Sequence, residues 1–181
     1  MRDIGMSYYR YSPDADNYLL ADCDDRPIAE RLFIAYQTPA SVRNNIPHLT
    51  LAVVGKGKKT DFPAIVNVPQ PLLSDRAWKI LQPLCDPEVE AIPATLSGDS
   101  FWLIHFLHRR DVIDMQRSLL LNHDAHYFRY VRTDRYAFRP NALAKYHLCS
   151  THAGTLVDDH FRQTVEQHKL KGLLFNPLAE V

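Results

Sequence analysis

The chain has 181 residues, 46% of them hydrophobic and 23% charged, which is enough for one domain with a substantial core and too little for two. These fractions are close to the averages of soluble globular proteins and argue against a disordered, collagen-like or coiled-coil chain. The 21 basic residues balance the 21 acidic residues, so the chain lacks the global positive charge of most nucleic-acid binders. We therefore expect a single domain over residues 1–181 and disfavour nucleic acid as a partner.

The cysteines and the apolar residues indicate the compartment in which the protein works. Cys23, Cys85 and Cys149 are odd in number and widely spaced, which argues against a disulfide framework and against a CxxC metal site. The N-terminal sequence MRDIGMSYYRYSPDADNYLL lacks the apolar core of a signal peptide, and no later apolar run approaches the roughly 20 residues that cross a bilayer. We expect a reducing, cytoplasmic location and no membrane contact.

The N-terminal stretch SYYRYSPDADNYLLADC, residues 7–23, predicts two short strands on either side of a turn, because aromatic and apolar residues bracket a cluster of Pro, Asp and Asn. The part of the chain from residue 14 to residue 25 contains five carboxylates and no basic residue: Asp14, Asp16, Asp22, Asp24 and Asp25. Such a run is typical of a solvated loop. Its charge also allows a face that binds a basic partner.

The next two segments differ in how clearly they predict structure. Residues 26–39, RPIAERLFIAYQTP, fit a short helix or an edge strand, since Leu32 belongs to both a helical and an alternating series of apolar residues. Residues 48–55, HLTLAVVG, predict a strand that ends at the lysine-rich sequence GKGKK. The two glycines of GKGKK lack the spacing of a phosphate-binding loop, so we expect a turn there.

Two later helices are predicted with the same kind of start. Ser74 is placed as an N-cap with Asp75 in the first turn, and Asp158 and Asp159 take the same positions near the C-terminus. Apolar residues then follow at helical spacing: Ala77, Trp78, Leu81 and Leu84 in the first helix, and Phe161 and Val165 in the second. Gly172 permits the turn that releases LLFNPL as a final strand.

Most of the remaining chain alternates in the manner of a sheet. VEAIPATLSGDSFWLIHFLH predicts a β-hairpin around SGDS, with SFWLIHFLH as its most apolar strand. HYFRYVRTDRYAFRP predicts a second hairpin around Thr133 and Asp134, and AKYHLCS and GTLV add two strand candidates. We therefore expect an α+β fold with a largely antiparallel or mixed sheet and a few helices packed on one face.

NHDAH, residues 122–126, is the candidate metal site. His123 and His126 lie three apart with Asp124 between them, which suits a metal if a third ligand arrives from elsewhere, as in a metal-dependent hydrolase. A chain with nine histidines also produces this spacing by chance, and it has no HExxH signature. We expect no metal and no cofactor, and we keep the His/Asp cluster as an alternative.

Cys149, Ser150 and His152 are the candidate nucleophiles and base. No GxSxG elbow or other strained nucleophile turn surrounds them, and a triad cannot be recognised from residue types alone. Cys149 is expected in a strand as a small buried hydrophobe. Asp158 and Asp159 are explained as a helix cap and a first-turn charge, so we predict no catalytic residue.

Aromatic residues alternate with arginines in YFRYVRTDRYAFRP, residues 127–140. The side chains that would carry binding are Arg129, Arg132, Arg135, Tyr136 and Arg139. The composition suits stacking and phosphate contacts in an RNA-binding module, and it equally suits a protein interface, where Arg and Tyr are enriched. A half-buried hairpin gives the same alternation, with one set of side chains inward and the other in water.

Three segments in a fixed order carry a resemblance to a known family: DFPAIVNVPQPLLSDRAWKILQPL, FWLIHFLHRRDVIDMQRS and GTLVDDHFRQTVEQHKLKGLLFNPL. A helix opened by Ser-Asp, a central strand leading to a short aspartate motif, and a C-terminal helix followed by GLxF resemble a bacterial family of immunity proteins from polymorphic toxin systems. The resemblance covers residues 61–178 as a family-like core. It does not extend to residues 1–60.

The resemblance implies a small intracellular protein that binds and neutralises a cognate secreted toxin domain, with no catalysis and no cofactor of its own. Such a protein needs a stable scaffold and a complementary surface. The terminal helix and strand would complete the scaffold, with Phe161, Val165, Leu173 and Phe175 in the core. The acidic run and the arginine-rich segment offer two faces for the toxin.

Overall fold

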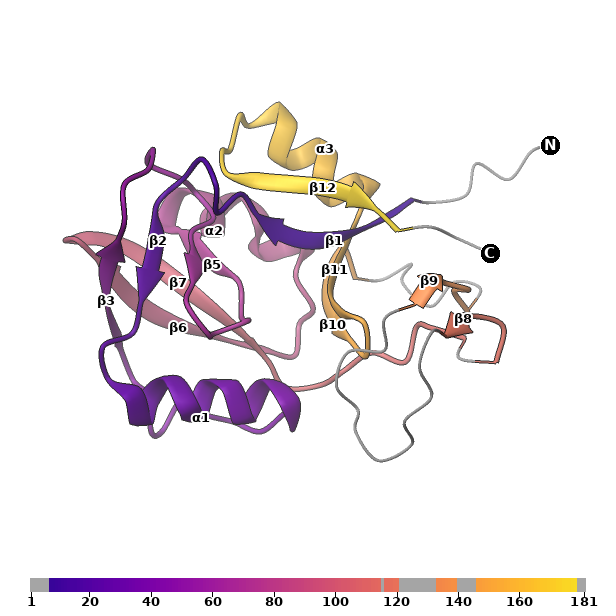
Figure 1. The fold of residues 1–181 in the computed structure, drawn as a ribbon, viewed down its shortest axis with the longest axis horizontal. Helices are drawn as coiled ribbons and strands as arrows, with labels where there is room; N and C mark the ends of the chain where they lie inside the picture. Colours follow the sequence, from indigo (N-terminus) through magenta and orange to yellow (C-terminus); the bar gives the residue numbers. More distant parts are fainter. Residues whose placement is uncertain (1–6, 115, 121–132, 140–145, 179–181) are drawn as a thin grey trace.

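The computed structural model describes residues 7–114, 116–120, 133–139 and 146–178 (Figure 1). Within these residues the strands form a six-stranded sheet, a four-stranded sheet and a two-stranded pair, and three α-helices accompany them. The predicted α+β class with mixed and antiparallel sheets is therefore confirmed. No helix in this part of the chain is long and apolar enough to cross a membrane.

The six-stranded sheet contains, in spatial order, β4 (Ala64–Ile65), β2 (Leu20–Asp22), β3 (Leu49–Val54), β6 (Val89–Leu96), β7 (Asp99–Phe106) and β5 (Leu72–Ser74). β3 and β6 run parallel, as do β2 and β4, and the other neighbours are antiparallel. β6 and β7 form the predicted hairpin. Ser97 and Gly98 close it with φ values of 51° and 85°, the left-handed conformation that a two-residue hairpin turn requires.

The four-stranded sheet contains β10 (Leu148–Thr151), β11 (Gly154–Asp158), β1 (Tyr8–Pro13) and β12 (Leu173–Pro177), all antiparallel. It joins the N-terminal strand to the last strand of the chain, and β1 and β12 lie side by side in Figure 1. The strands predicted around SPDADN, in AKYHLCS and in GTLV are thereby confirmed.

The helices are α1 (Arg26–Gln37), α2 (Asp75–Leu81) and α3 (Asp159–Gln167). The segment that fitted helix or strand is thus helical, and Asp25 caps it by accepting a hydrogen bond from the Ile28 amide at 3.2 Å. The two predicted caps are confirmed. Ser74 Oγ accepts from the Ala77 amide at 3.1 Å, and Asp158 Oδ1 accepts from the Phe161 amide at 2.9 Å.

Strand β7 is buried on both faces, so the sheet is covered on both sides. Leu103 belongs to a core cluster that also contains Leu32 of α1. Ile104, whose side chain points the opposite way, belongs to a second cluster with Phe161 of α3 and the inner face of the four-stranded sheet. The sequence analysis placed the helices on one face, whereas α1 and α3 lie on opposite sides in Figure 1, because β7 needs both covers.

The C-terminal helix and strand enter the second cluster as expected. Phe161 and Val165 are buried, and Leu173 and Phe175 are partly buried against the same cluster. One predicted turn is wrong. Thr133 and Asp134 lie in strand β9 (Thr133–Arg135), which pairs with β8 (Leu119–Leu120). The partner strand ends at Leu120, before the segment that was predicted as a hairpin, so Thr133 and Asp134 are paired residues and not the turn.

An ion pair joins the segment before β6 to the segment after β7, and both segments bond β10 of the other large sheet through their backbones. β10 is hydrogen-bonded to the segment after α2, where the Asp86 amide donates to Leu148 O at 3.0 Å. The Asp86 carboxylate is 1% exposed and accepts two bonds from the Arg110 guanidinium, each 2.6 Å long. Arg110 also pairs with Glu88, which is half exposed, and lies over the ring of Tyr146 at 4.5 Å from its centroid. This bidentate pair fixes the segment before β6 against the segment after β7, at the place where both meet β10.

We expect Asp86→Ala to lower the free energy of unfolding by about 2–4 kcal/mol, because the partly buried Arg110 loses its bidentate partner. Glu88→Gln is the matched control and should cost less than about 1 kcal/mol, since its contact is solvent-exposed. Urea denaturation of both variants measures the difference. An equal loss of unfolding free energy in the two variants would show that the Asp86–Arg110 pair does not hold its two segments together.

Gly172 is required by the turn between α3 and β12. Its φ is 101°, and an added Cβ would lie 1.8 Å from Thr60 Oγ1. Thr60 cannot move away without loss, because its hydroxyl donates to Lys171 O at 2.8 Å and accepts from the Phe62 amide at 3.0 Å. The loop after β3 is therefore fixed against this turn.

Gly172→Ala should lower the unfolding free energy by about 2–4 kcal/mol, from backbone strain and the collision with Thr60 together. Gly98→Ala is its control, since φ is also positive, at 85°, but no atom lies within 4 Å of the added Cβ. That variant should lose about 1 kcal/mol from strain alone. Thermal unfolding of the pair tests the collision, which is refuted if the two variants melt together.

Candidate partner-binding surfaces

The predicted acidic run is divided by strand β2. Asp14 and Asp16 lie in the turn before β2, Asp22 is its last residue, and Asp24 and Asp25 follow it. Asp16, Asp24 and Asp25 are exposed, and the other two are half-buried. The five carboxylates therefore face solvent at the two ends of one strand and do not form a single cluster.

Two members of the run have structural partners. The Asp14 carboxylate accepts from the Asn17 side-chain amide at 3.0 Å and from the Asn17 backbone amide at 3.3 Å, which fixes the turn. Asp25 is the N-cap of α1. Asp16 and Asp24 make no hydrogen bond or ion pair within the described residues, so they are the carboxylates of the run most available to a partner.

The arginine-rich segment lies partly outside the described residues, as Arg129 and Arg132 do. Arg135 and Arg139 are exposed, and Arg139 pairs with the exposed Asp111 at 3.0 Å. Tyr136, in contrast, is only 3% exposed. Its ring lies in the core and cannot meet a partner in this fold.

The burial of Tyr136 has a visible cause. Its hydroxyl accepts a hydrogen bond from Arg10 Nη2 at 3.1 Å, and its ring stacks on Phe138 with centroids 6.2 Å apart. Phe138 in turn contacts Tyr8 of β1. The alternation in this segment therefore places Tyr136 and Phe138 toward the protein and the arginines on either side toward water.

The candidate metal ligands His123, Asp124 and His126 lie outside the described residues. In the part of the chain that is described, no group of three or more His, Cys, Asp or Glu side chains is placed to hold a metal ion. Cys149 and Ser150 are buried in β10 at 1% and 2% exposure, as expected for Cys149. Burial raises the pKa of Cys149 to about 12, which keeps its thiol protonated and unreactive at neutral pH.

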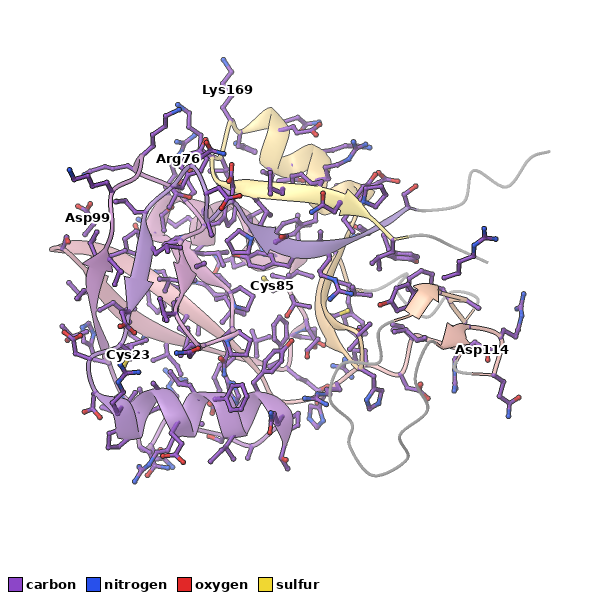
Figure 2. The ribbon with its side chains drawn as sticks, viewed as in Figure 1. Cys23, Arg76, Cys85, Asp99, Asp114 and Lys169 are labelled. Carbon is purple, nitrogen blue, oxygen red and sulfur yellow. The ribbon has the colours of Figure 1, made fainter. Side chains whose placement is uncertain are left out.

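A pair of adjoining hollows, which we call the corner pocket, lies at one end of the six-stranded sheet. The first has a volume of about 320 Å³ and an apolar floor of Leu19, Val53, Leu96 and Phe101. The second, of about 490 Å³, is lined by polar side chains that include Asp61, Ser74, Asp75, Arg76, Ser100 and Lys171. Lys59, Thr60, Asp99 and Phe101 line both. Figure 2 labels Arg76 and Asp99 on this side of the molecule and shows Lys169 pointing outward from the turn after α3.

Asp61 holds the polar hollow together. Its carboxylate accepts from Ser74 Oγ at 2.7 Å and from the Lys171 amide at 2.9 Å. Its backbone repeats both links, since the Asp61 amide donates to Lys171 O at 2.8 Å and the Ser74 amide donates to Asp61 O at 2.9 Å. Three segments far apart in sequence, the loop after β3, the start of α2 and the turn before β12, are thereby fixed to one another.

The loop that carries GKGKK is also held by close backbone contact. The Lys58 amide donates to Asn17 O at 3.2 Å, and the Leu19 amide donates to Lys58 O at 3.0 Å. A Cβ on Gly57 would lie 2.5 Å from the carbonyl carbon of Tyr18, so only glycine allows this approach. The predicted turn is therefore a rigid support for the lysines around it.

The carboxylates of the corner pocket already have partners. Asp99 pairs with Lys59 at 3.1 Å, and Asp75 pairs with Lys79 at 2.6 Å. Hydrogen bonds from Lys79 and from the Trp102 indole keep the pKa of Asp75 below its usual range, so this carboxyl stays ionised. The Asp61 carboxylate accepts from two neutral donors, the Ser74 hydroxyl and the Lys171 backbone amide.

Four cations around the corner pocket have no such partner. We call them the rim cations: Lys58, Arg76, Lys169 and Lys171. All four are exposed, and none takes part in an ion pair with the described residues. Arg76 donates only to a neutral backbone carbonyl, His168 O, at 2.5 Å. Of these four, Arg76 and Lys171 line the polar hollow. With Lys59 they make three cations against the three carboxylates Asp61, Asp75 and Asp99, so this lining carries charges of both signs.

Apart from the corner pocket, a hollow of about 430 Å³ lies beside α1. Arg26, Ala29, Glu30 and Phe33 of the helix line it with Asn67. Phe33 is 39% exposed and its neighbour Ile34 is 54% exposed. This face offers apolar area with charges of both signs.

Residues 91–180 match the model of an immunity protein family, Imm11. This part of the chain is similar to that family. The resemblance expected from the sequence is thereby confirmed, although residues 61–90 of its expected span lie outside the match. A search of curated proteins gave no match.

The exposed ion pair between the two hollows should add little to stability. Lys59 is 86% exposed and Asp99 is 60% exposed, and such pairs contribute about 0.2–1 kcal/mol. We expect Asp99→Asn to change the unfolding free energy by less than about 0.5 kcal/mol in urea denaturation. A loss of several kcal/mol would mean that the pair is a structural element and cannot open for a ligand.

Proposed function

We propose that this chain is a cytoplasmic immunity protein that binds a cognate toxin domain and neutralises it without catalysis of its own. The observation that carries the proposal is the Imm11 match over residues 91–180. It favours binding to a protein over the metal-dependent hydrolase and over the RNA-binding module. The balanced charge of the chain supports the same choice, since affinity for nucleic acid depends on an excess of cations.

We further propose that exposed members of the two predicted charged sets contact the toxin. Asp16 and Asp24 have side chains free of hydrogen bonds within the described residues. Arg135 and Arg139 are the exposed arginines of the positively charged set within the described residues. Complementary charges of this kind raise the association rate and select the partner more than they raise the affinity.

The test is co-expression of the chain with the product of the neighbouring gene in a toxin-sensitive cell. The proposal expects restored growth and a one-to-one complex on size-exclusion chromatography. The double variant Asp16→Lys/Asp24→Lys should slow association at low salt, with a smaller effect at high salt, because exposed charges are screened. Stopped-flow or surface-plasmon binding measures both rates.

The control is Glu30→Lys, an exposed carboxylate on α1 outside the predicted sets. A neighbouring product that is toxic, and that kills cells whether or not the chain is present, would refute the proposed function. Unchanged association of the double variant would refute only the acidic contact.

A further inference from the structure

Strand β12 has backbone groups on its outer side that the described fold does not use. The Leu178 amide donates to Tyr8 O at 3.0 Å, so Leu178 and every second residue before it turn their backbone groups toward β1. Because these groups alternate in direction along an antiparallel ladder, Leu173, Phe175 and Pro177 turn theirs away from β1. No hydrogen bond within the described residues uses the outward groups. The outer edge therefore presents the N–H and C=O of Leu173 and Phe175 and the C=O of Pro177.

The other sheet edges are closed by the chain itself. Beside β10, the Asp86 and Arg110 amides donate to carbonyl oxygens of that strand at 3.0 Å and 2.7 Å. At β5, the Ser74 amide donates to Asp61 O at 2.9 Å. The remaining edge belongs to β4, which has only two residues. Among the described residues, β12 is therefore the long strand with a free edge.

The side chains of β12 do not protect this edge. Natural edge strands are commonly shielded by charged side chains, by a bulge or by proline. β12 has the uncharged sequence LLFNP, its register with β1 is unbroken, and its proline stands at its end. Leu174 is 43% exposed, and Leu173 and Phe175 are only partly buried against the second cluster. A strand added here would cover apolar area on both faces of the sheet.

The free groups of the edge specify a polypeptide as their partner. Donors and acceptors that alternate at the spacing of a strand are matched by another extended backbone. A nucleic acid brings a charged phosphate at every nucleotide, and β12 has no cation to receive it. The partner side chains beside Leu173, Leu174 and Phe175 would meet apolar neighbours. An extended segment with apolar side chains therefore fits this edge.

A second copy of the chain fits the same edge poorly. Two β12 strands paired about Phe175 would place each Pro177 opposite a Leu173, and proline has no N–H to donate to Leu173 O. Such a contact would use the five residues of β12 from each copy, whereas a stable interface takes roughly 20–30 residues a side. The edge thus favours a different protein, whose strand can have an N–H opposite Leu173 and whose surface can extend the contact beyond β12.

From this geometry we propose that β12 is the docking edge for an extended apolar segment of the toxin domain, which adds to the four-stranded sheet as a further strand. The inference rests on the proposed function for the identity of the partner and on the structure for the chemistry of its segment. β12 lies inside residues 91–180, which match the Imm11 model. The paired backbone would supply affinity, whereas the exposed charges proposed above act mainly on the association rate.

Amide hydrogen exchange tests the pairing residue by residue, in the free chain and in its complex with the product of the neighbouring gene. In the free chain, the Leu173 and Phe175 amides should exchange fast, whereas the Leu174 and Asn176 amides face β1 and should exchange slowly. In the complex, the Leu173 and Phe175 amides should slow by at least about tenfold. NMR spectroscopy measures each amide separately.

Phe175→Pro removes an outward N–H that the described fold does not use, which an edge strand tolerates. Phe175→Val is its matched control, because it also loses the ring contact with Tyr9 but keeps the N–H. Phe175→Pro should weaken the complex at least about tenfold relative to Phe175→Val, since a partner carbonyl is left without its donor. Surface-plasmon binding measures both dissociation constants, and thermal unfolding checks both folds. If Phe175→Pro does not fold, the exchange measurement on the unaltered chain decides.

Fast exchange of the Leu173 and Phe175 amides in the complex would overturn the inference, and so would equal binding of the two Phe175 variants. A dimer of the free chain that Phe175→Pro abolishes and Phe175→Val keeps would overturn it too, since the edge would then pair with a second copy. These outcomes leave the growth-protection test of the immunity function unaffected. Failure of that test, with no complex formed, would remove the proposed function and with it the toxin as the occupant of the edge.

Discussion

Strand β7 has no solvent face, and this constraint organises the molecule. Leu103 on one side and Ile104 on the other are both fully buried, so each face of the six-stranded sheet needs a cover. The chain supplies α1 for one face and the four-stranded sheet with α2 and α3 for the other. With both faces covered, this sheet can offer a partner only its ends, its edges and the outer surfaces of its covers. The corner pocket is at one such end.

Features that depend on neighbouring residues could be predicted from the sequence. Ser74 and Asp158 cap helices by bonds to amides three residues ahead, so their type and position are sufficient evidence. The β6–β7 hairpin is equally local, because Ser97 and Gly98 determine the turn. Residues 26–37 were ambiguous since apolar residues fit both periods, and burial against the sheet decided for the helix.

Features that depend on distant residues could not be predicted. Tyr136 is typical of an interface by composition, but Arg10, more than a hundred residues earlier, donates a hydrogen bond to its hydroxyl, and its ring is buried in the core. The corner pocket is the clearest case, because its lining comes from the loop after β3, the start of α2, the hairpin tip and the turn before β12. The sequence offered one signal, the GKGKK segment, in which Gly57 allows the close backbone contact at Tyr18.

The position of β1 between β11 and β12 has a consequence for the way the protein is made. Tyr9 pairs with Val157 on one side and with Pro177 on the other, so β1 has no neighbour in its sheet until β11 has been synthesised, and its second neighbour, β12, follows later. At the usual rate of translation this delay is on the order of ten seconds. During that time the apolar side of β1 is open to other chains and to chaperones. A chain that has been synthesised only as far as α3 therefore cannot complete the four-stranded sheet.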